Sequence, residues 1–436
     1  MVAPALLERL GLHRRELRAW AYYDVANSAF MTTVLAVFPL YFVRVPAAGL
    51  PEAVARSRYD FATAFAVGLV GLLGPFLGAV ADHRASKKRF LGGFLALGAA
   101  ATAALGLASR GEWLFALLAF VIANIGITST LAFYNALLPG IASRDEIDRV
   151  STGGFALGYL GGGALFALNL WMIASPGRFG LADAAAASRA SFLSVAVWWV
   201  VFSIPLFRRV PEPGTAVGPA GESALRVARR RLVSTIRELR RFPDAGLMLL
   251  AFFVYNEAIN TIIRMATLYG DEIRIPTTQL MLALLMVQLV GMPFSFAFGA
   301  MADRIGARRA ISVALAAYVG ISVYAYFIHT VLQFFVLAFL VATVMGGAQA
   351  LSRSLFATLV PRHKAGEMFG FFAVCDRLGN GGIGSLLFGL MLLLTGSSRP
   401  AILALVVFFA VGALLLSRVD VERGRRLARQ AEATAA

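Results

Sequence analysis

Long apolar segments recur along the whole chain, and they restrict its fold more than any other feature of the sequence. A helix needs about 20 predominantly apolar residues to cross a bilayer, and 59% of the 436 residues are hydrophobic. Continuous runs of this length exclude an outer-membrane barrel, whose strands alternate over about ten residues. We therefore expect an all-α membrane protein with twelve transmembrane helices. The segments span approximately 20–43, 59–81, 89–109, 113–139, 150–174, 189–207, 245–269, 277–301, 309–329, 331–360, 368–395 and 398–417.

Basic residues outnumber acidic ones, with 40 Lys and Arg against 24 Asp and Glu and a formal net charge of +16. Such an excess can indicate nucleic-acid binding. Here most of the cations fall in the loops and tails of one side of the expected topology, which is the positive-inside pattern. We therefore expect membrane lipids as partners, no nucleic acid, both termini in the cytoplasm and a bacterial inner (plasma) membrane location. The N-terminal stretch also lacks the cleavage site of a signal peptide.

Two copies of one loop pattern indicate two homologous halves. Gly78 and Asp82 follow the second segment in GAVADHRASKKR, and Gly299 and Asp303 follow the eighth in GAMADRIGARR, at the same residue offset. Repeats in register predict two six-helix halves with a binding site between them, as in major facilitator transporters. We expect these halves at 1–207 and 245–417, a cytoplasmic linker with a basic amphipathic helix at 208–244, and a polar, partly disordered cytoplasmic tail at 418–436.

Several motifs resemble those of a known family. The two GxxxD loops resemble the signature loop of the major facilitator superfamily, which implies that they gate one conformation of a transport cycle. The stretch WAYYDVANSAF resembles the signature of a bacterial "unknown major facilitator" family related to fungal vacuolar amino-acid effluxers linked to autophagy. The stretches FYNALLPGIA, YNEAINTIIRMATLYG and GGAQALSRSLFATLVP agree with it. The resemblance covers nearly the whole transmembrane part and implies transport of amino acids or small peptides.

The first helix carries an acidic residue where a charge is costly. Asp24 and Asn27 are three residues apart, so one helical turn places them on the same face. A charge retained in a membrane helix usually faces a cavity or a partner. We expect Asp24 near the cytoplasmic end, either as a gate or proton group facing the cavity, or as an interfacial acid paired with a helix end or an arginine. The neighbouring Trp20, Tyr22 and Tyr23 fit an interfacial aromatic belt.

The seventh helix carries an acid near the middle of the membrane. Glu257 lies between Asn256 and Asn260, and Arg264 follows two turns further on. A charge at this depth is more expensive than one near the interface, which makes Glu257 a candidate for the central contact with substrate or proton. Related proteins often carry Asn-Asp-Gly where this chain has Asn256-Glu257-Ala258, and this departure leaves the role of the stretch open.

The tenth and eleventh helices add three polar candidates. Gln349 precedes Arg353 by one turn on the tenth helix, which lines the cavity in this superfamily, and arginine suits a carboxylate or phosphate. We place a midplane substrate contact on Arg353 together with Glu257. Asp376 on the eleventh helix has a depth similar to that of Arg353. We therefore expect an ion pair between Arg353 and Asp376, with Arg377 as a competing partner and with either a structural or a functional role.

Other chemistries find little support in the sequence. The four histidines show no ligand spacing, and a single cysteine excludes an intrachain disulfide. The glycine-rich stretches follow no strand and lack a Walker lysine, and no nucleophile–base set is visible, so we expect neither an enzyme nor a cofactor. We expect a monomeric secondary transporter with alternating access and, as a hypothesis, proton coupling. The alternatives are efflux of drugs or other amphiphiles, or a transporter-like lipid scramblase or sensor.

Overall fold

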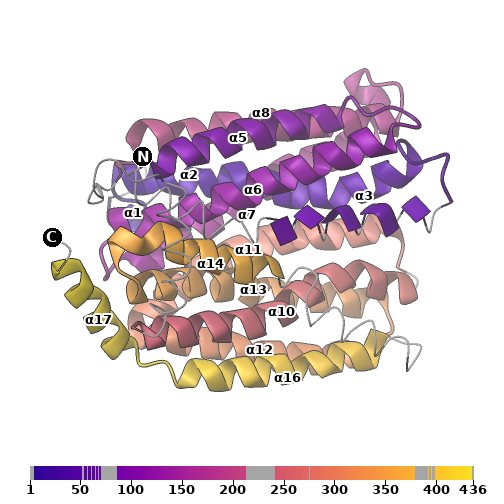
Figure 1. Ribbon diagram of the computed structural model, residues 1–436. Helices are drawn as coiled ribbons and strands as arrows, with labels where there is room; N and C mark the ends of the chain where they lie inside the picture. Colours follow the sequence, from indigo (N-terminus) through magenta and orange to yellow (C-terminus); the bar gives the residue numbers. More distant parts are fainter. Residues whose placement is uncertain are drawn as a thin grey trace.

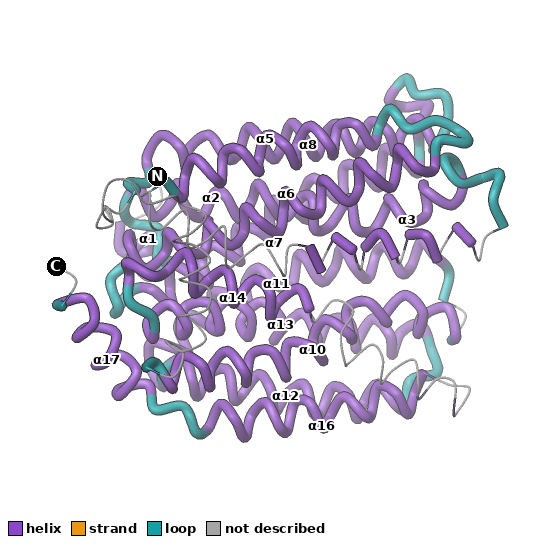
Figure 2. The backbone as a smooth tube through the Cα atoms, in the orientation of Figure 1, coloured by secondary structure: helices purple, strands orange, loops and turns teal. Residues whose placement is uncertain are grey.

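The computed structural model describes residues 4–51, 86–212, 241–273, 275–378 and 398–434, with short pieces between 54 and 69 and single residues at 391 and 394. Every regular element in this part of the chain is a helix. The long helices run side by side along one direction, and α1 and α17 lie at the same end of the bundle (Figures 1 and 2). We call this the terminal end and the opposite end the distal end.

The helices form two groups, before and after the linker. The N-terminal group contains α1 (Pro4–Arg9), α2 (Arg15–Ala29), the π-helix η1 (Phe30–Val34), α3 (Leu35–Arg44), α5 (Lys87–Leu105), α6 (Trp113–Ile141), α7 (Ile147–Ala174), η2 (Pro176–Phe179) and α8 (Ala184–Arg209). The C-terminal group contains α10 (Pro243–Glu272), α11 (Thr277–Ile305), α12 (Ala307–Tyr326), α13 (Val331–Leu359), η3 (Arg362–Lys364), α14 (Ala365–Leu378), α16 (Ser398–Ser417) and α17 (Val421–Ala433).

The described helices have the length and composition of membrane spans. Nine of them, with α2, η1 and α3 counted as one span from Arg15 to Arg44, are long and apolar enough to cross a bilayer. α5 matches the third expected segment. Large apolar side chains face outward, such as Leu118 at 54% and Leu289 at 58% exposure, as lipid-facing residues do. The second and eleventh expected segments and the linker lie largely outside the described residues, so the twelve-helix arrangement stays a prediction.

Small residues allow the two groups to pack closely along α7 and α11. A Cβ atom added at Gly299 of α11 would meet the side chain of Thr152 on α7. A Cβ added at Gly291 would lie 3.1 Å from the ring of Tyr159, also on α7. Small residues at helix contacts let backbones approach without loss of packing. The groups therefore meet along a continuous helix pair, and a cavity between them is bounded by this contact.

The C-terminal tail differs from its expected state. Residues Val421–Ala433 form the helix α17, whose preceding residue Asp420 caps it by accepting a hydrogen bond from the backbone N–H of Arg423. A cap of this kind satisfies one of the free N–H groups at a helix start. Gly424 and Ala428 of α17 are buried against the bundle. The expectation of a partly disordered tail is thus wrong for these residues.

Candidate functional site

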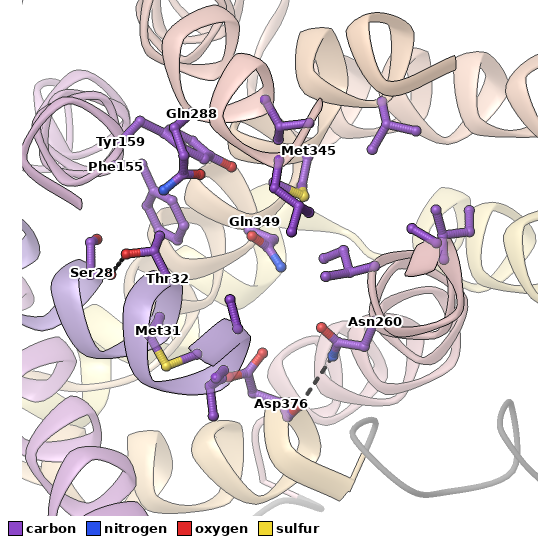
Figure 3. A pocket seen from close by; sticks show the side chains of 18 of the residues that line it. Ser28, Met31, Thr32, Phe155, Tyr159, Asn260, Gln288, Met345, Gln349 and Asp376 are labelled. Atoms are coloured by element: carbon purple, nitrogen blue, oxygen red, sulfur yellow. Dashed lines mark hydrogen bonds between the residues drawn. The ribbon is translucent and has the colours of Figure 1, made fainter. Parts of the chain in front are cut away.

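A cavity of about 1010 Å³ lies between the two groups. Its wall on the N-terminal group is largely polar, whereas its wall on the C-terminal group is largely apolar apart from a few side chains such as Asn260, Gln349 and Asp376, which are labelled in Figure 3. The polar side includes Asn27, Ser28, Thr32, Asn124, Thr128 and Asn135, and the apolar side includes Ile262, Leu284, Val287, Leu337, Val341 and Met345. A space of this size suits a small solute. The lining extends from Asp24 and Arg353 to Tyr269 and Phe334 near the distal ends of α10 and α13.

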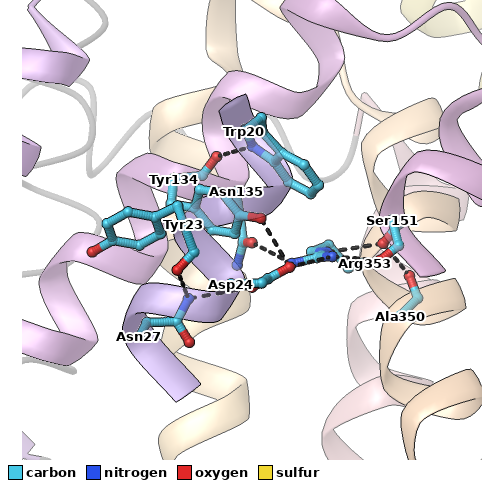
Figure 4. Close-up of polar contacts among 9 residues, drawn as sticks. All are labelled: Trp20, Tyr23, Asp24, Asn27, Tyr134, Asn135, Ser151, Ala350 and Arg353. Carbon is cyan, nitrogen blue, oxygen red and sulfur yellow. Dashed lines mark hydrogen bonds and ion pairs between the residues drawn. The ribbon is translucent and has the colours of Figure 1, made fainter. Parts of the chain in front are cut away.

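Asp24 and Arg353 form a buried ion pair at the terminal end of this cavity (Figure 4). Both terminal guanidinium nitrogens of Arg353 lie 3.2 Å from one carboxylate oxygen of Asp24. The side chains are only 4% and 8% exposed. Asn27 donates a hydrogen bond to the other carboxylate oxygen at 3.2 Å. Removing either charge would leave the other buried without its counter-ion, which is strongly unfavourable.

Arg353 joins the two helix groups. It belongs to α13, yet its hydrogen-bond partners in the described part of the chain all belong to the N-terminal group. Its Nε donates to the Ser151 hydroxyl at 2.8 Å, and one terminal nitrogen donates to the Ser151 carbonyl at 2.7 Å. The other donates to Asn135 at 3.4 Å. We call Asp24, Asn135, Ser151 and Arg353 the cross-group cluster.

Aromatic rings surround the cross-group cluster. Trp20 stacks on Tyr134 with ring centroids 4.4 Å apart, and its indole N–H donates to the Tyr134 carbonyl at 3.1 Å. The Tyr134 hydroxyl donates to Asp24 at 2.8 Å, and the Arg353 guanidinium lies 4.7 Å from the Trp20 ring centroid, within cation–π distance. Trp20 and Tyr23 are wholly buried, so their interpretation as an interfacial belt is wrong, whereas Tyr22 is 40% exposed.

Two glycines of α7 make room for the cluster. A Cβ atom at Gly154 would overlap a carboxylate oxygen of Asp24 and would lie 3.2 Å from Arg353. A Cβ at Gly158 would lie 2.7 Å from the hydroxyl of Ser28. The glycine-rich start of α7 therefore lets α2 approach closely enough for Asp24 to reach Arg353. The glycine-rich stretch of α7 is therefore a helix contact surface of the small-xxx-small kind.

The expected pair of Arg353 with Asp376 is wrong. Asp376 of α14 accepts a hydrogen bond from Asn256 at 3.0 Å, and its backbone carbonyl accepts one from Asn260 at 3.3 Å. Arg353 instead contacts Asp24. The helix α2 begins at Arg15, earlier than the apolar segment, so about 13 Å of helix precedes Asp24 at 1.5 Å per residue. Asp24 thus lies deeper than the apolar segment indicated, at the level of Arg353.

Glu257 does not occupy the expected place in the cavity. Asn256 and Glu257 are wholly buried and are absent from the cavity lining, while Asn260, Gln349 and Asp376 line it. The contact placed jointly on Glu257 and Arg353 is therefore not supported for Glu257, whereas Arg353 lines the cavity as part of the cross-group cluster. The depth of a residue in the membrane predicts the free-energy cost of its charge, but it does not predict whether its side chain points into the cavity.

The remaining candidates have varied positions. Asp303 of the second GxxxD loop forms an ion pair with Arg149 at the start of α7, at 3.2 Å, so this loop contacts the N-terminal group at the terminal end. Gly78 and Asp82 of the first loop lie outside the described residues, as does the side chain of Arg264 on α10. A gating role for the two loops stays a prediction.

Sequence reasoning missed two members of the cross-group cluster. Ser151 was not a candidate, although it opens the glycine-rich stretch STGGFALGYLGGG, and Asn135 was not among the candidate site residues. Tyr134, which donates to Asp24, was not a candidate site residue either. A polar residue flanking a glycine stripe is a weak signal, because glycine already marks a close helix contact. The partner across the contact cannot be identified from local pattern.

Comparisons with known proteins find a matching family model and related sequences. The family model described as "Vacuole effluxer Atg22 like" matches residues 45–429. The "Uncharacterized MFS-type transporter YxiO" of Bacillus subtilis is 34% identical over 426 residues, covering 95% of this chain and 97% of that protein. Autophagy-related protein 22 of Yarrowia lipolytica is 29% identical over 318 residues. The match covers 65% of this chain and 52% of the fungal protein, so it spans about half of that relative.

Solved structures show the same fold. The human organic anion transporter MFSD10 superposes with a TM-score of 0.70 at 16% identity, covering 92% of this chain and 99% of that one. The major facilitator proton:xylose symporter XylE superposes with a TM-score of 0.69 at 14% identity, covering 93% and 95%. Identities this low show the fold alone. Together with the family match, they show that the chain is a major facilitator transporter and belongs to the vacuole effluxer Atg22-like family.

Proposed function

We propose that the protein is a secondary active transporter that moves a small polar solute by alternating access. The halves 1–207 and 245–417 would rock around the central cavity, opening it first at one end and then at the other. The observation that carries this proposal is the cross-group cluster, in which Arg353 of the C-terminal group is held by Asp24 and Ser151 of the N-terminal group. These contacts must break when the terminal end opens.

Amino acids or small peptides are the favoured solutes. Kinship with vacuolar amino-acid effluxers supports this choice, and so do the charged side chains at the terminal end of the cavity. The carboxylate of Asp24 and the guanidinium of Arg353 present opposite charges 3.2 Å apart, which match the ammonium and carboxylate groups of a zwitterion. A zwitterion inserted between them would keep both buried charges paired while separating the two groups. Solute binding and opening of the terminal end would then be coupled.

Proton coupling is part of the same proposal. Asp24 and Asp376 line the cavity, and Glu257 is buried beside it on α10. Acids inside membrane spans are commonly proton relays. Protonation of Asp24 would remove the charge that faces Arg353 and weaken the cross-group cluster. A proton gradient could therefore shift the balance between the two access states.

The proposed topology places both termini in the cytoplasm of a bacterium, with a monomer in the inner membrane. Its support is the charge of the terminal end, where the loops and helix ends carry Arg144, Arg304, Arg308, Arg309 and Arg362. Cytoplasmic loops carry such an excess of cations. On this assignment the cavity extends toward the periplasmic side, and the cross-group cluster closes the cytoplasmic side.

Reconstituted vesicles test the proposal. Purified protein in proteoliposomes should take up or exchange radiolabelled amino acids or dipeptides saturably, and a pH gradient should change the rate. Asp24→Asn should abolish the response to the gradient, whereas Glu422→Gln on the exposed face of α17, at 74% side-chain exposure, should leave it intact. Folded protein that exchanges none of these solutes would contradict the substrate class. Uptake indifferent to the gradient, and to Asp24→Asn and Glu257→Gln, would contradict proton coupling.

Efflux of amphiphilic compounds is a second candidate, favoured by the asymmetric cavity wall. The apolar side formed by Ile262, Leu284, Leu337 and Val341 could hold a hydrocarbon group while the polar side holds a head group. Apolar pockets with a few polar groups bind such molecules. Competition decides between the candidates: an amphiphile that is transported but not displaced by amino acids would favour the second.

A further inference from the structure

α17 is fixed to the C-terminal group by its first turn. Arg423 donates two hydrogen bonds to the Asp244 carboxylate at the start of α10, at 2.7 and 2.8 Å. The backbone N–H of Asp420 donates to the same carboxylate at 2.9 Å, and the Asp244 side chain is wholly buried. A bidentate contact between arginine and carboxylate is both strong and directional. The beginning of α17 therefore moves with α10.

The rest of α17 reaches the N-terminal group through Arg144, in the loop between α6 and α7. Arg144 donates hydrogen bonds to the carbonyls of Thr358 at 2.8 Å and Arg425 at 3.5 Å. Its guanidinium also lies 3.6 Å from the Glu432 carboxylate in the last turn of α17. Glu432 in turn accepts a hydrogen bond from the backbone N–H of Arg362 at 3.0 Å. α17 thus contacts both groups, and it lies at the terminal end of the bundle (Figure 1).

We propose that α17 is a strap that stabilises the closed terminal end of the transporter. The inference rests on the alternating-access function proposed above. When the two groups part at this end, Arg144 must leave Glu432 and the carbonyls of Thr358 and Arg425. The contact of Arg423 with Asp244 keeps α17 on the C-terminal group, so the strap opens at its Arg144 side.

The strap is a modulating contact rather than the main lock. The side chains of Arg144 and Glu432 are 17% and 26% exposed, whereas the Asp24–Arg353 pair is nearly buried. Partly exposed ion pairs contribute modestly and weaken as salt screens them. The strap therefore makes the equilibrium between the closed and open terminal end sensitive to ionic strength. The cross-group cluster contributes most of the free energy that favours the closed state.

Spin labels can measure the separation of the two groups directly. Arg209→Cys at the end of α8 and Arg309→Cys at the start of α12 are exposed positions on opposite groups, and Cys375→Ser removes the single native cysteine. Double electron–electron resonance on the full chain in nanodiscs then reports the fraction of molecules with parted groups.

Charge changes in α17 test the strap. Glu432→Arg places a cation beside Arg144 and should raise the parted fraction about 2- to 5-fold, as expected for a partly exposed pair, and Glu432→Gln should raise it less. Glu422→Gln is the matched control, because it removes the same charge from the same helix, and the ion-pair partner of Glu422 within the described residues is Arg425 of α17 itself, at 3.6 Å. It should leave the distribution unchanged.

Two outcomes would overturn the strap. A distance distribution unchanged by Glu432→Arg would show that α17 does not hold the end closed, and equal effects of Glu432→Gln and Glu422→Gln would assign the effect to net charge alone. Arg353→Ala keeps this proposal separate from the transport mechanism, because it should part the groups whether or not the strap exists. If Arg353→Ala parts them and Glu432→Arg does not, only the strap is wrong. If neither parts them, alternating access itself fails.

Discussion

Neutralising Asp24 should open the terminal end of the transporter. Asp24→Asn keeps the shape of the side chain and removes its charge, so the closed state must hold the Arg353 guanidinium at 4% exposure without its counter-ion. Arg353 keeps its hydrogen bonds to the hydroxyl and the carbonyl of Ser151. These acceptors are neutral, so they do not balance its charge. In the open state Arg353 would face water, so the substitution penalises the closed state selectively.

The size of this effect follows from the burial of the pair. Breaking a buried ion pair by removing one partner costs about 3–5 kcal/mol. Asp24 and Arg353 border a cavity of about 1010 Å³ that water can reach, and hydration there lowers the cost, so we expect about 2–3 kcal/mol, somewhat below that range. At 1.4 kcal/mol per factor of ten, the open fraction should rise about 30- to 150-fold.

Alkylation of a buried cysteine measures this change. Ala357 is 3% exposed at the closed terminal end, so Ala357→Cys in a Cys375→Ser background should react with a maleimide only when that end opens. The reaction rate should rise with the open fraction in Asp24→Asn. Asp145→Asn, which removes an exposed carboxylate at the same end, should leave the rate unchanged. A rate in Asp24→Asn within twofold of the parent would refute the role assigned to the ion pair.

Two further substitutions probe the surroundings of the cluster. Gly154→Ala should lower thermal stability by about 1–3 kcal/mol through overpacking against Asp24, whereas Gly93→Ala, with nothing within 4 Å of the added Cβ, should not; equal melting temperatures in detergent would contradict this. Arg149→Gln removes the partner of Asp303, and the side chains of this pair are 28% and 37% exposed. It should therefore raise the alkylation rate of Ala357→Cys only about 2- to 5-fold. A larger rise than that caused by Asp24→Asn would contradict the greater importance assigned to the buried pair.

The membrane class and the family could be predicted from the sequence because both depend on local pattern. Apolar length alone marks a span, and the motif around Asp24 lies within one helix. The partner of Asp24 could not be predicted in the same way. Arg353 lies 329 residues further along the chain, and which side chains meet across that distance depends on the rotation of α2, α7 and α13 against one another.

Glu257 and Asp376 show a second limit of sequence reasoning. Glu257 was expected in the cavity and Asp376 beside Arg353, because an acid inside the membrane is costly and requires a partner. That cost states only that a partner exists. Glu257 is wholly buried and does not line the cavity, whereas Asn260, three residues further along α10, does. Arg353 was correctly chosen as a cavity residue, but for a contact with the wrong acid.

A reversible lock at the terminal end tests alternating access most directly. A Cβ built at Gly299 lies 3.3 Å from the Cβ of Thr152, close to the separation of about 3.5–4.5 Å found in disulfides. Thr152→Cys with Gly299→Cys, in a Cys375→Ser background, should therefore cross-link the two groups on oxidation. We expect oxidised proteoliposomes to lose solute exchange and to recover it on reduction, whereas oxidation should not change the exchange rate of either single cysteine variant. Full exchange by completely cross-linked protein would contradict alternating access at this end.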